Sequence, residues 1–171
     1  MPEALSPQAT RGAFRRATFL YSRFLDGLLV LTVLILIIPV TLQIFARFTE
    51  LIPRYIWTEE AARFLLVWMV MIGGTIGVRE GTHFIVDLLP SATGKLKAVL
   101  DLIAGNFVLV FAFIFLWYGI EFTQFAWFRI SELAELPLWL IHIAWPIAGF
   151  SWLLFQGERM WDDVQILRGR G

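Results

Sequence analysis

The sequence contains no cysteine, and its 171 residues carry equal numbers of basic and acidic side chains, 14 of each. The absence of cysteine excludes disulfides, thiolate metal sites and cysteine nucleophiles. A net charge of zero gives no extended positive field of the kind that nucleic-acid binding needs, so we expect no nucleic-acid partner. The chain also lacks a Walker A motif and any recognisable set of nucleophile, base and orienting residue. We therefore predict neither an ATPase nor another enzyme, and no bound cofactor or metal.

Apolar residues dominate what is present: 58% of the chain is hydrophobic and the mean hydropathy is +0.73. These values are typical of an integral membrane protein. A helix needs about 20 apolar residues to cross a bilayer. Four stretches approach or exceed this length, at about 27–46, 61–78, 98–120 and 137–156. The sequence thus predicts an all-α membrane domain over 25–157 with four transmembrane helices, flanked by tails at 1–24 and 158–171.

Basic residues predict the orientation of the four spans, because cytoplasmic segments are enriched in Lys and Arg. With both termini inside, the cytoplasmic segments hold ten basic residues: Arg11, Arg15, Arg16, Arg23, Arg79, Lys95, Lys97, Arg159, Arg168 and Arg170. The outer side holds the remaining four: Arg47, Arg54, Arg63 and Arg129. We therefore predict that both termini lie in the cytoplasm.

Two segments next to the spans mix aromatic and charged residues. Residues 13–24 form either a short helix in the headgroup layer or a basic flank that only orients the first span. Residues 121–136 suit either an interfacial helix or a helical extension beyond the bilayer. Pro39 and Pro146 lie inside the first and fourth spans and should disturb their hydrogen bonding.

The end of the first span carries Gln43, with Arg47 one turn later on the same face. A glutamine that faced lipid would be costly, so this face is expected to meet protein. The alternative is an interfacial glutamine with an arginine that reaches the headgroups.

The second span has polar groups at both ends and small residues between them. Glu59, Glu60 and Arg63 occupy its first turn, where they form either a salt-bridged helix start or a contact with a partner subunit or Arg47. Gly73 and Gly77 are four residues apart, a spacing that allows another helix to approach closely. Such a helix is suited to packing against protein.

Charged residues reappear where this apolar run stops, at Arg79, Glu80 and His83. The histidines raise the question of haem, which small four-helix membrane anchors often bind between a His pair. The predicted topology places His83 on the inner side and His142 near the outer side, most of a bilayer apart. We therefore expect His83 to lie in a loop and His142 to make an interfacial or helix contact.

The order of these motifs resembles one known family. The motifs are Gln43 to Arg47, Trp57-Thr58-Glu59-Glu60 with Arg63 and Trp68, Gly73-Gly74, Arg79-Glu80-Gly81-Thr82-His83 with Asp87, and Leu136-Pro137-Leu138-Trp139 with Pro146. Together they resemble the small membrane subunit (Q, or DctQ type) of tripartite ATP-independent periplasmic (TRAP) transporters. The family usually has Tyr after the first-span arginine, where this chain has Phe48.

The resemblance implies a four-helix scaffold in the inner membrane of a bacterium or archaeon. It would bind a larger membrane (M) subunit that holds the sodium and substrate sites. A periplasmic binding protein would deliver a carboxylate solute, and a sodium or proton gradient would drive uptake. The family's small subunit has no established catalytic or substrate residues, so the resemblance gives the residues above only structural or interface roles.

Two other functions fit a small four-span chain. One is the membrane anchor of a quinone-linked redox enzyme. The other is a transporter or channel that works alone, but the polar residues Gln43, Asp101 and Asn106 all lie towards the ends of their spans. A chain that moves a solute by itself is expected to have polar groups near the bilayer midplane.

Overall fold

The computed structural model describes residues 7–49, 53, 55–80 and 95–168. Its elements are α1 (Pro7–Phe48), α2 (Trp57–Glu80), α3 (Lys95–Phe125), α4 (Trp139–His142) and α5 (Ala144–Leu167). Four helical stretches are long and apolar enough to cross a membrane: Phe14–Phe48, Trp57–Glu80, Val99–Phe125 and Trp139–Gln165. The prediction of an all-α protein with four transmembrane helices is therefore confirmed.

The first helix is much longer than a bilayer requires. It has 42 residues, which at 1.5 Å per residue is about 63 Å, roughly twice the thickness of the hydrocarbon core. Residues 13–24 form the N-terminal part of this helix, which continues without interruption into the first span and past Pro39. The third helix likewise extends to Phe125, beyond the span expected from hydropathy.

The last span is interrupted at Ile143, between α4 and α5. Pro146 explains the position of this break, since proline has no N–H to donate to the carbonyl four residues earlier, that of His142. Proline is tolerated in the first turn of a helix, which is where α5 places it. The chain resumes its helical bonding at once, because Ile147 N donates to Ile143 O at 3.3 Å.

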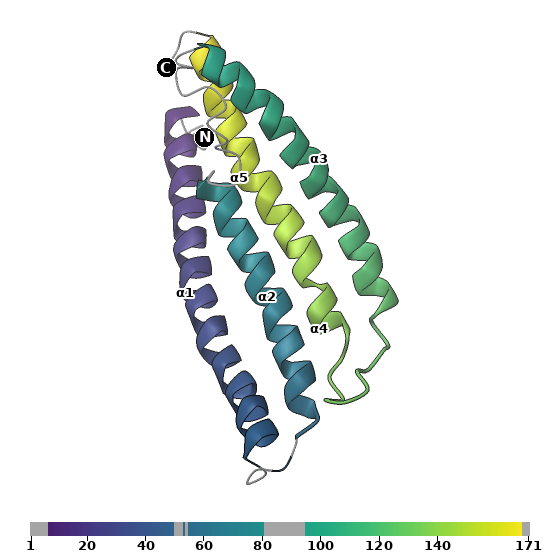
Figure 1. Cartoon of the computed structure of the whole chain (residues 1–171). Coiled ribbons are helices and arrows are strands. Elements are labelled where there is room, and N and C mark those ends of the chain that lie inside the picture. The colour runs from purple at the N-terminus through teal and green to yellow at the C-terminus, as the bar shows by residue number, and fades with distance from the viewer. Residues whose placement is uncertain (1–6, 50–52, 54, 81–94, 169–171) are drawn as a thin grey trace, which may run out of the picture.

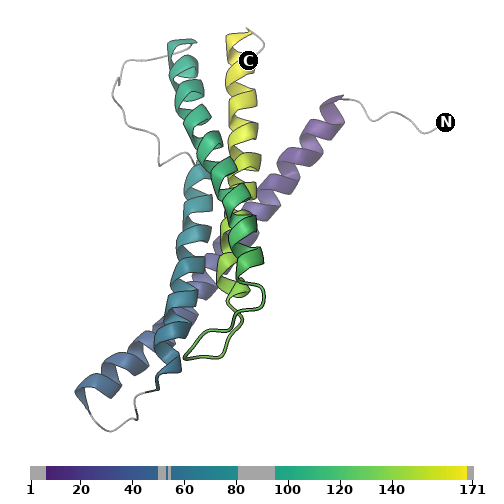
Figure 2. The same cartoon turned by 90° about the vertical axis from the view of Figure 1, so that its right-hand side faces the viewer.

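The helices form a row instead of a closed bundle. The extended packing interfaces join α1 to α2, α2 to α5 and α5 to α3, so the spatial order is α1–α2–α5–α3 (Figure 1). Seen along this row, α1 crosses the other helices obliquely (Figure 2). The N-terminal end of α1 and the C-terminal end of α5 lie at the same end of the molecule (Figure 1). A row leaves both of its faces open to lipid or to other proteins.

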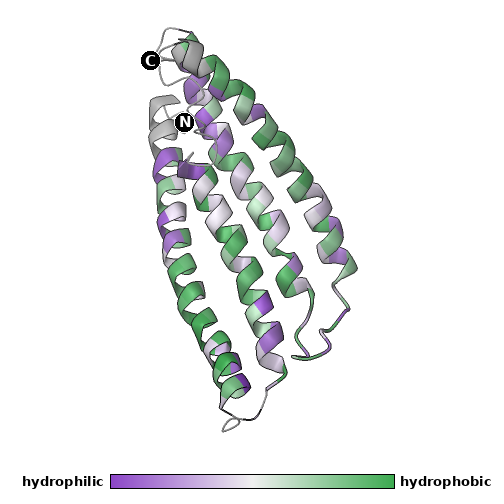
Figure 3. Cartoon of the chain, viewed as in Figure 1, coloured by the Kyte–Doolittle hydropathy of each residue, from purple (hydrophilic) through white to green (hydrophobic). Residues whose placement is uncertain are grey.

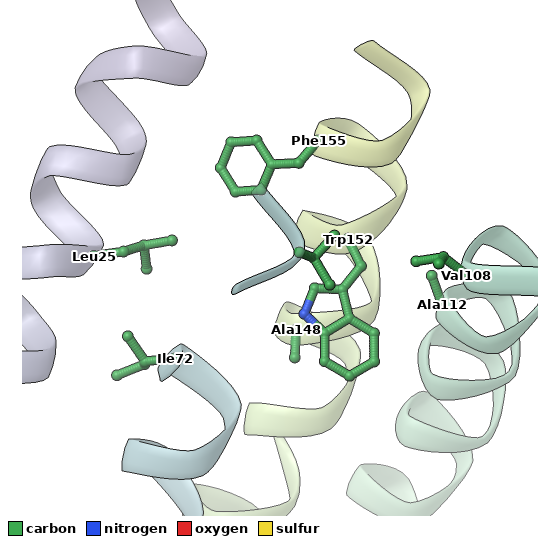
Figure 4. Packing of buried hydrophobic residues seen from close by; sticks show 8 residues of the cluster. Leu25, Ile72, Val108, Ala112, Ala148, Trp152 and Phe155 are labelled. Atoms are coloured by element: carbon green, nitrogen blue, oxygen red, sulfur yellow. The ribbon is translucent and has the colours of Figure 1, made fainter. Parts of the chain in front are cut away.

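The buried core runs along the middle of the row. Leu25 of α1 and Ile72 of α2 lie on one side of α5, while Trp152 of α5 faces Val108 and Ala112 of α3 on the other (Figure 4). Apolar side chains also cover much of the outside, and hydrophobic residues occupy much of each long helix, with hydrophilic ones mainly towards the ends (Figure 3). The core is thin, as expected for a chain whose exposed surface is solvated by lipid.

Residues 126–138 connect α3 to α4 as a short hairpin, which we call the α3–α4 hairpin. Ile130 and Pro137 form an isolated antiparallel bridge. Its two backbone hydrogen bonds run from Ser131 N to Leu136 O at 2.8 Å and from Leu138 N to Arg129 O at 2.9 Å. The hairpin is neither the interfacial helix nor the helical extension that residues 121–136 suggested, except for the last turn of α3.

Candidate functional site

A pocket of about 540 Å³ with both polar and apolar lining opens between the end of α1 and the start of α2. Gln43 and Arg47 line it from α1, and Tyr55, Thr58 and Glu59 line it from the other side. The Nε2 atom of Gln43 is buried and has no hydrogen-bond partner among the described residues. Gln43, Arg47 and Glu59 thus line the same pocket, which agrees with the expectation that the charges of α2 lie near Arg47. Their contact with a partner protein stays a prediction.

The three charged residues in the first turn of α2 separate into two groups. Arg63 Nη2 lies 3.8 Å from Glu59 Oε1, and both side chains are mostly exposed. Glu60 turns the other way and is 93% buried, with 7% of its surface exposed. Its Oε2 atom accepts the N–H groups of Leu133 at 3.0 Å and Ala134 at 2.6 Å. Glu60 therefore ties α2 to the α3–α4 hairpin.

Two tryptophans tie α2 to the last span. Trp68 Nε1 donates to the backbone carbonyl of Leu140, 72 residues later, at 3.0 Å. Trp152 Nε1 donates to Thr75 Oγ1 at 3.1 Å. Indole N–H groups buried among apolar side chains need such acceptors. Trp68, one of the residues on which the family resemblance rests, thus has a structural role within this chain.

The three glycines of α2 differ in how closely other residues approach them. A Cβ added to Gly73 would meet no atom within 4 Å, so this position faces open space. A Cβ on Gly74 would lie 3.4 Å from Trp152, an ordinary van der Waals contact. Gly77 is buried. The close helix approach expected at Gly73 does not occur within the described residues, and this position remains available to another protein.

Close helix approach occurs instead between α3 and α5. A Cβ added to Gly149 would lie 2.6 Å from Leu116 N and 2.8 Å from Ala112 O. A Cβ added to Gly119 would lie 2.7 Å from Pro146 N. These neighbours are backbone atoms, so a larger residue would push the helices apart. Sequence reasoning missed this interface, which we call the α3–α5 seam.

A signal for this seam is present in the sequence. Gly105, Ala112 and Gly119 recur at intervals of seven residues along α3. Seven residues make nearly two helical turns, so these three small residues lie on one face. A search for seven-residue repeats of small residues would have found the face, whereas the four-residue spacing of Gly73 and Gly77 drew attention to another helix.

At the opposite end of α2, Arg79 lies between two aromatic rings. Its guanidinium carbon is 5.5 Å from the centroid of Phe19 in α1 and 5.7 Å from that of Phe155 in α5. Such cation–π contacts stabilise an arginine side chain at a helix end. Glu80, the last residue of α2, is exposed. His83 lies outside the described residues.

Further charged contacts fasten the same end of the row. Arg15 Nη2 lies 2.5 Å from Asp162 Oδ1 and 2.7 Å from Oδ2, and Arg15 Nε lies 3.8 Å from Glu158. Arg159 donates to the carbonyl of Val78 at 3.4 Å, near the C-terminus of α2. Arginine is well suited to bind both carboxylate and carbonyl oxygens. These contacts join α1 and α2 to the final turns of α5.

His142 packs within the chain. Its Nδ1 atom lies 2.7 Å from the carbonyl oxygen of Leu138, and its ring stacks on that of Phe122 with centroids 5.3 Å apart. Among the described residues, no group of three or more His, Asp or Glu side chains is arranged to hold a metal ion. Several polar groups, among them Glu60, Trp68, Trp152 and Arg15, instead connect helices to one another or to the α3–α4 hairpin.

Comparisons with known proteins agree with this interpretation. Residues 36–166 match the family model of tripartite ATP-independent periplasmic transporters, DctQ component. The sialic acid TRAP transporter small permease protein SiaQ of Vibrio cholerae is 28% identical over 118 residues, covering 67% of this chain and 66% of that protein. The C4-dicarboxylate TRAP transporter small permease protein DctQ of Rhodobacter capsulatus is 32% identical over 107 residues, covering 59% and 45%.

A third relative is larger. The sialic acid TRAP transporter permease protein SiaT of Haemophilus influenzae is 30% identical over 93 residues, which cover 54% of this chain and 15% of that protein. The chain thus spans between 15% and 66% of the lengths of these three relatives. None of them favours the anchor of a redox enzyme. Because the family model covers the chain from within α1 almost to the end of α5, the chain belongs to the DctQ component family of tripartite ATP-independent periplasmic transporters.

Proposed function

We propose that this chain is the static small subunit of a transporter that takes up a carboxylate solute along an ion gradient. Its partners are a larger membrane subunit, which contains the solute and ion sites, and a periplasmic binding protein. The named relatives support a carboxylate, since both sialic acid and C4-dicarboxylates carry one. The family and the four apolar helices make the chain a multi-pass protein of the bacterial inner membrane.

The observation that carries this proposal is the open row of four helices. The described helices form a single row with a thin core, and they include no second domain against which this row could move (Figure 1). Residues 27–46, 64–78, 102–120 and 136–157 contain no Asp, Glu, Lys or Arg. The middle of the membrane therefore offers no charged group of this chain to a solute or ion. Both features suit a fixed frame beside which a partner moves.

The relative from Haemophilus influenzae supports a stable association with a larger membrane protein. In it, a segment similar to this chain makes up 15% of a single permease protein. Partners that are joined in one polypeptide in one organism often associate as separate chains in another. We place the contact on the face of α2 that carries Gly73, where an added Cβ would meet no atom of the described residues within 4 Å.

We further propose that both termini lie in the cytoplasm. The support is the distribution of basic residues together with the even number of spans. The end of the row that contains Gln43 and the α3–α4 hairpin then faces the periplasm, where the binding protein arrives.

Reconstitution tests the proposal directly. The chain alone in proteoliposomes should give no uptake of radiolabelled sialic acid or succinate. Uptake of one of them should appear with the large subunit and the binding protein, and should disappear when the ion gradient is collapsed. Transport by the isolated chain, or full transport by the large subunit without it, would overturn the proposal.

The position of the contact has its own test. Gly73→Leu should reduce co-purification of this chain with a tagged large subunit and leave the isolated chain folded. Gly27→Leu is the matched control, because a Cβ at Gly27 of α1 also meets no atom within 4 Å. Equal recovery of both variants with the large subunit would move the interface away from Gly73.

A further inference from the structure

The α3–α4 hairpin exposes several large apolar side chains. Phe128 is 93% exposed, Ile130 64% and Trp127 53%. The hairpin is nevertheless a built structure with its own bridge, and Leu136 N also donates to Ser131 Oγ at 3.1 Å. A segment with defined hydrogen bonds that presents such side chains is a candidate interaction surface.

The height of the hairpin relative to the membrane follows from the position of Glu60. This residue lies in the first turn of α2, immediately before the apolar run that begins at Ala61. Because Glu60 accepts the N–H groups of Leu133 and Ala134, the hairpin lies beside this first turn and does not project away from it. Figure 1 shows the hairpin level with the start of α2.

Other aromatic residues mark the same level. Tyr55 and Trp57, at the start of α2, are each 47% exposed. The rings of Trp127 and Trp139 stack with centroids 5.5 Å apart, at the two ends of the hairpin. Tryptophan and tyrosine are enriched where membrane proteins cross the headgroup layer. These residues indicate that the hairpin lies at the edge of the bilayer.

The hairpin also has a polar side. Glu132 and Glu135 are exposed, and Glu135 has a φ of 53°, in the left-handed region that only a constrained turn imposes on such a residue. Arg129 lies over the ring of Phe125 with its guanidinium carbon 3.9 Å from the centroid. Apolar side chains thus alternate with charged groups that can remain in water or contact headgroups.

We propose that the α3–α4 hairpin lies in the headgroup layer of the bilayer, with Phe128 and Ile130 inserted among the lipids, and that Glu60 holds it there. The occupant of this surface is lipid, because the hairpin directly continues an apolar span and is level with the other aromatic residues at this end. Glu60 is a positioning residue: it contacts the backbone of the hairpin and leaves the inserted side chains free.

The chain contains no cysteine, so a single introduced cysteine can carry a fluorescent probe. Phe128→Cys would be labelled with an environment-sensitive fluorophore in nanodiscs of phosphatidylcholine and phosphatidylglycerol, which leave both membrane faces accessible. Quenching would be measured with lipids that carry a spin label near the headgroup or deep in the acyl chain, and with aqueous iodide. Glu132→Cys, in the same hairpin, reports aqueous exposure, and Phe113→Cys, 56% exposed within α3, reports the acyl region.

The probe at Phe128 should be quenched more strongly by the shallow spin label than by the deep one. Iodide should quench it severalfold less than it quenches the probe at Glu132. Iodide quenching equal to that at Glu132 would place Phe128 in water and overturn the proposal. Loss of both lipid and iodide quenching when the large subunit is co-reconstituted would also overturn it, because a protein would then cover this surface.

The role of Glu60 is tested in the same background. Glu60→Ala should increase iodide quenching at Phe128, since the hairpin loses its link to α2. Glu59→Ala, the neighbouring change on an exposed side chain, should leave the quenching unchanged. Identical quenching in both variants would show that Glu60 does not position the hairpin. Uptake by the full transporter is a separate readout, so failure of this proposal would leave the proposed transport function standing.

Discussion

The α3–α5 seam and the glycine-bearing face of α2 use the same small residues in different ways. In the seam, the added Cβ of Gly149 would meet backbone atoms at 2.6 and 2.8 Å, so glycine is required for the two helices to pack. On α2, the added Cβ of Gly73 would meet nothing within 4 Å. The comparison teaches that a small residue allows close approach only where a second helix is present to use it.

This difference separates folding from assembly. The α3–α5 seam is satisfied within the chain, and its glycines serve the fold. The face of α2 around Gly73 remains uncovered within the described residues, although helices in lipid associate through faces of this kind. We infer that the α3–α5 seam stabilises the fold of this subunit, whereas the α2 face around Gly73 is the surface on which we propose that the large subunit binds.

The largest expected effect comes from Trp152, which connects α2 to the two helices of the α3–α5 seam. Its ring lies 4.9 Å from that of Phe115 in α3, its Nε1 donates to Thr75 in α2, and it packs against Gly74. Trp152→Ala should lower the free energy of unfolding by about 3–5 kcal/mol, because it leaves a cavity and removes the N–H group that donates to Thr75 Oγ1. The measurement is equilibrium unfolding in mixed micelles, followed by far-ultraviolet circular dichroism.

Trp152→Phe is the control for this change. It keeps an aromatic ring and loses the hydrogen bond to Thr75, so its cost should be near 1 kcal/mol. If Trp152→Ala lowered the free energy of unfolding no more than Trp152→Phe does, packing of Trp152 between α2 and α3 would not stabilise the fold.

An intermediate effect is expected from alanine in the seam. Gly149→Ala places a methyl group against the backbone of Leu116 and Ala112 and should cost about 1–3 kcal/mol through overpacking. Gly73→Ala, the same change on the open face, should instead stabilise the isolated chain by up to about 1 kcal/mol, since alanine favours helix over glycine. Unfolding of both variants in mixed micelles compares them directly. Equal effects would remove the distinction between the two regions.

The smallest effect is expected in the first turn of α2. The side chains of Arg63 and Glu59 are 60% and 68% exposed, so Arg63→Ala should cost the isolated chain about 0–1 kcal/mol. Glu60→Ala should lower the free energy of unfolding more than Arg63→Ala does, because it leaves two N–H groups of the hairpin without their acceptor. If Arg63→Ala proved the more damaging of the two in the isolated chain, the three charged residues would act as one cluster.

Much of this protein could be predicted from the sequence. Four apolar stretches, charged residues at their ends and an order of motifs from Gln43 to Pro146 led to the helix count and the family. These properties are local: a span must be about 20 apolar residues long whatever it packs against. The break before Pro146 could also be predicted, because proline has no N–H to bond to the carbonyl four residues earlier.

Only the tertiary structure decided which faces of these helices meet. It joined Trp68 to Leu140 and Glu60 to the hairpin, across 72 residues or more of sequence. It placed close packing at Gly119 and Gly149 and left Gly73 open. The physical reason is that lipid tails are as apolar as leucine, so hydropathy shows that a helix lies in the membrane without showing which side contacts protein. That choice depends on the shapes and hydrogen-bonding groups of two helices at once.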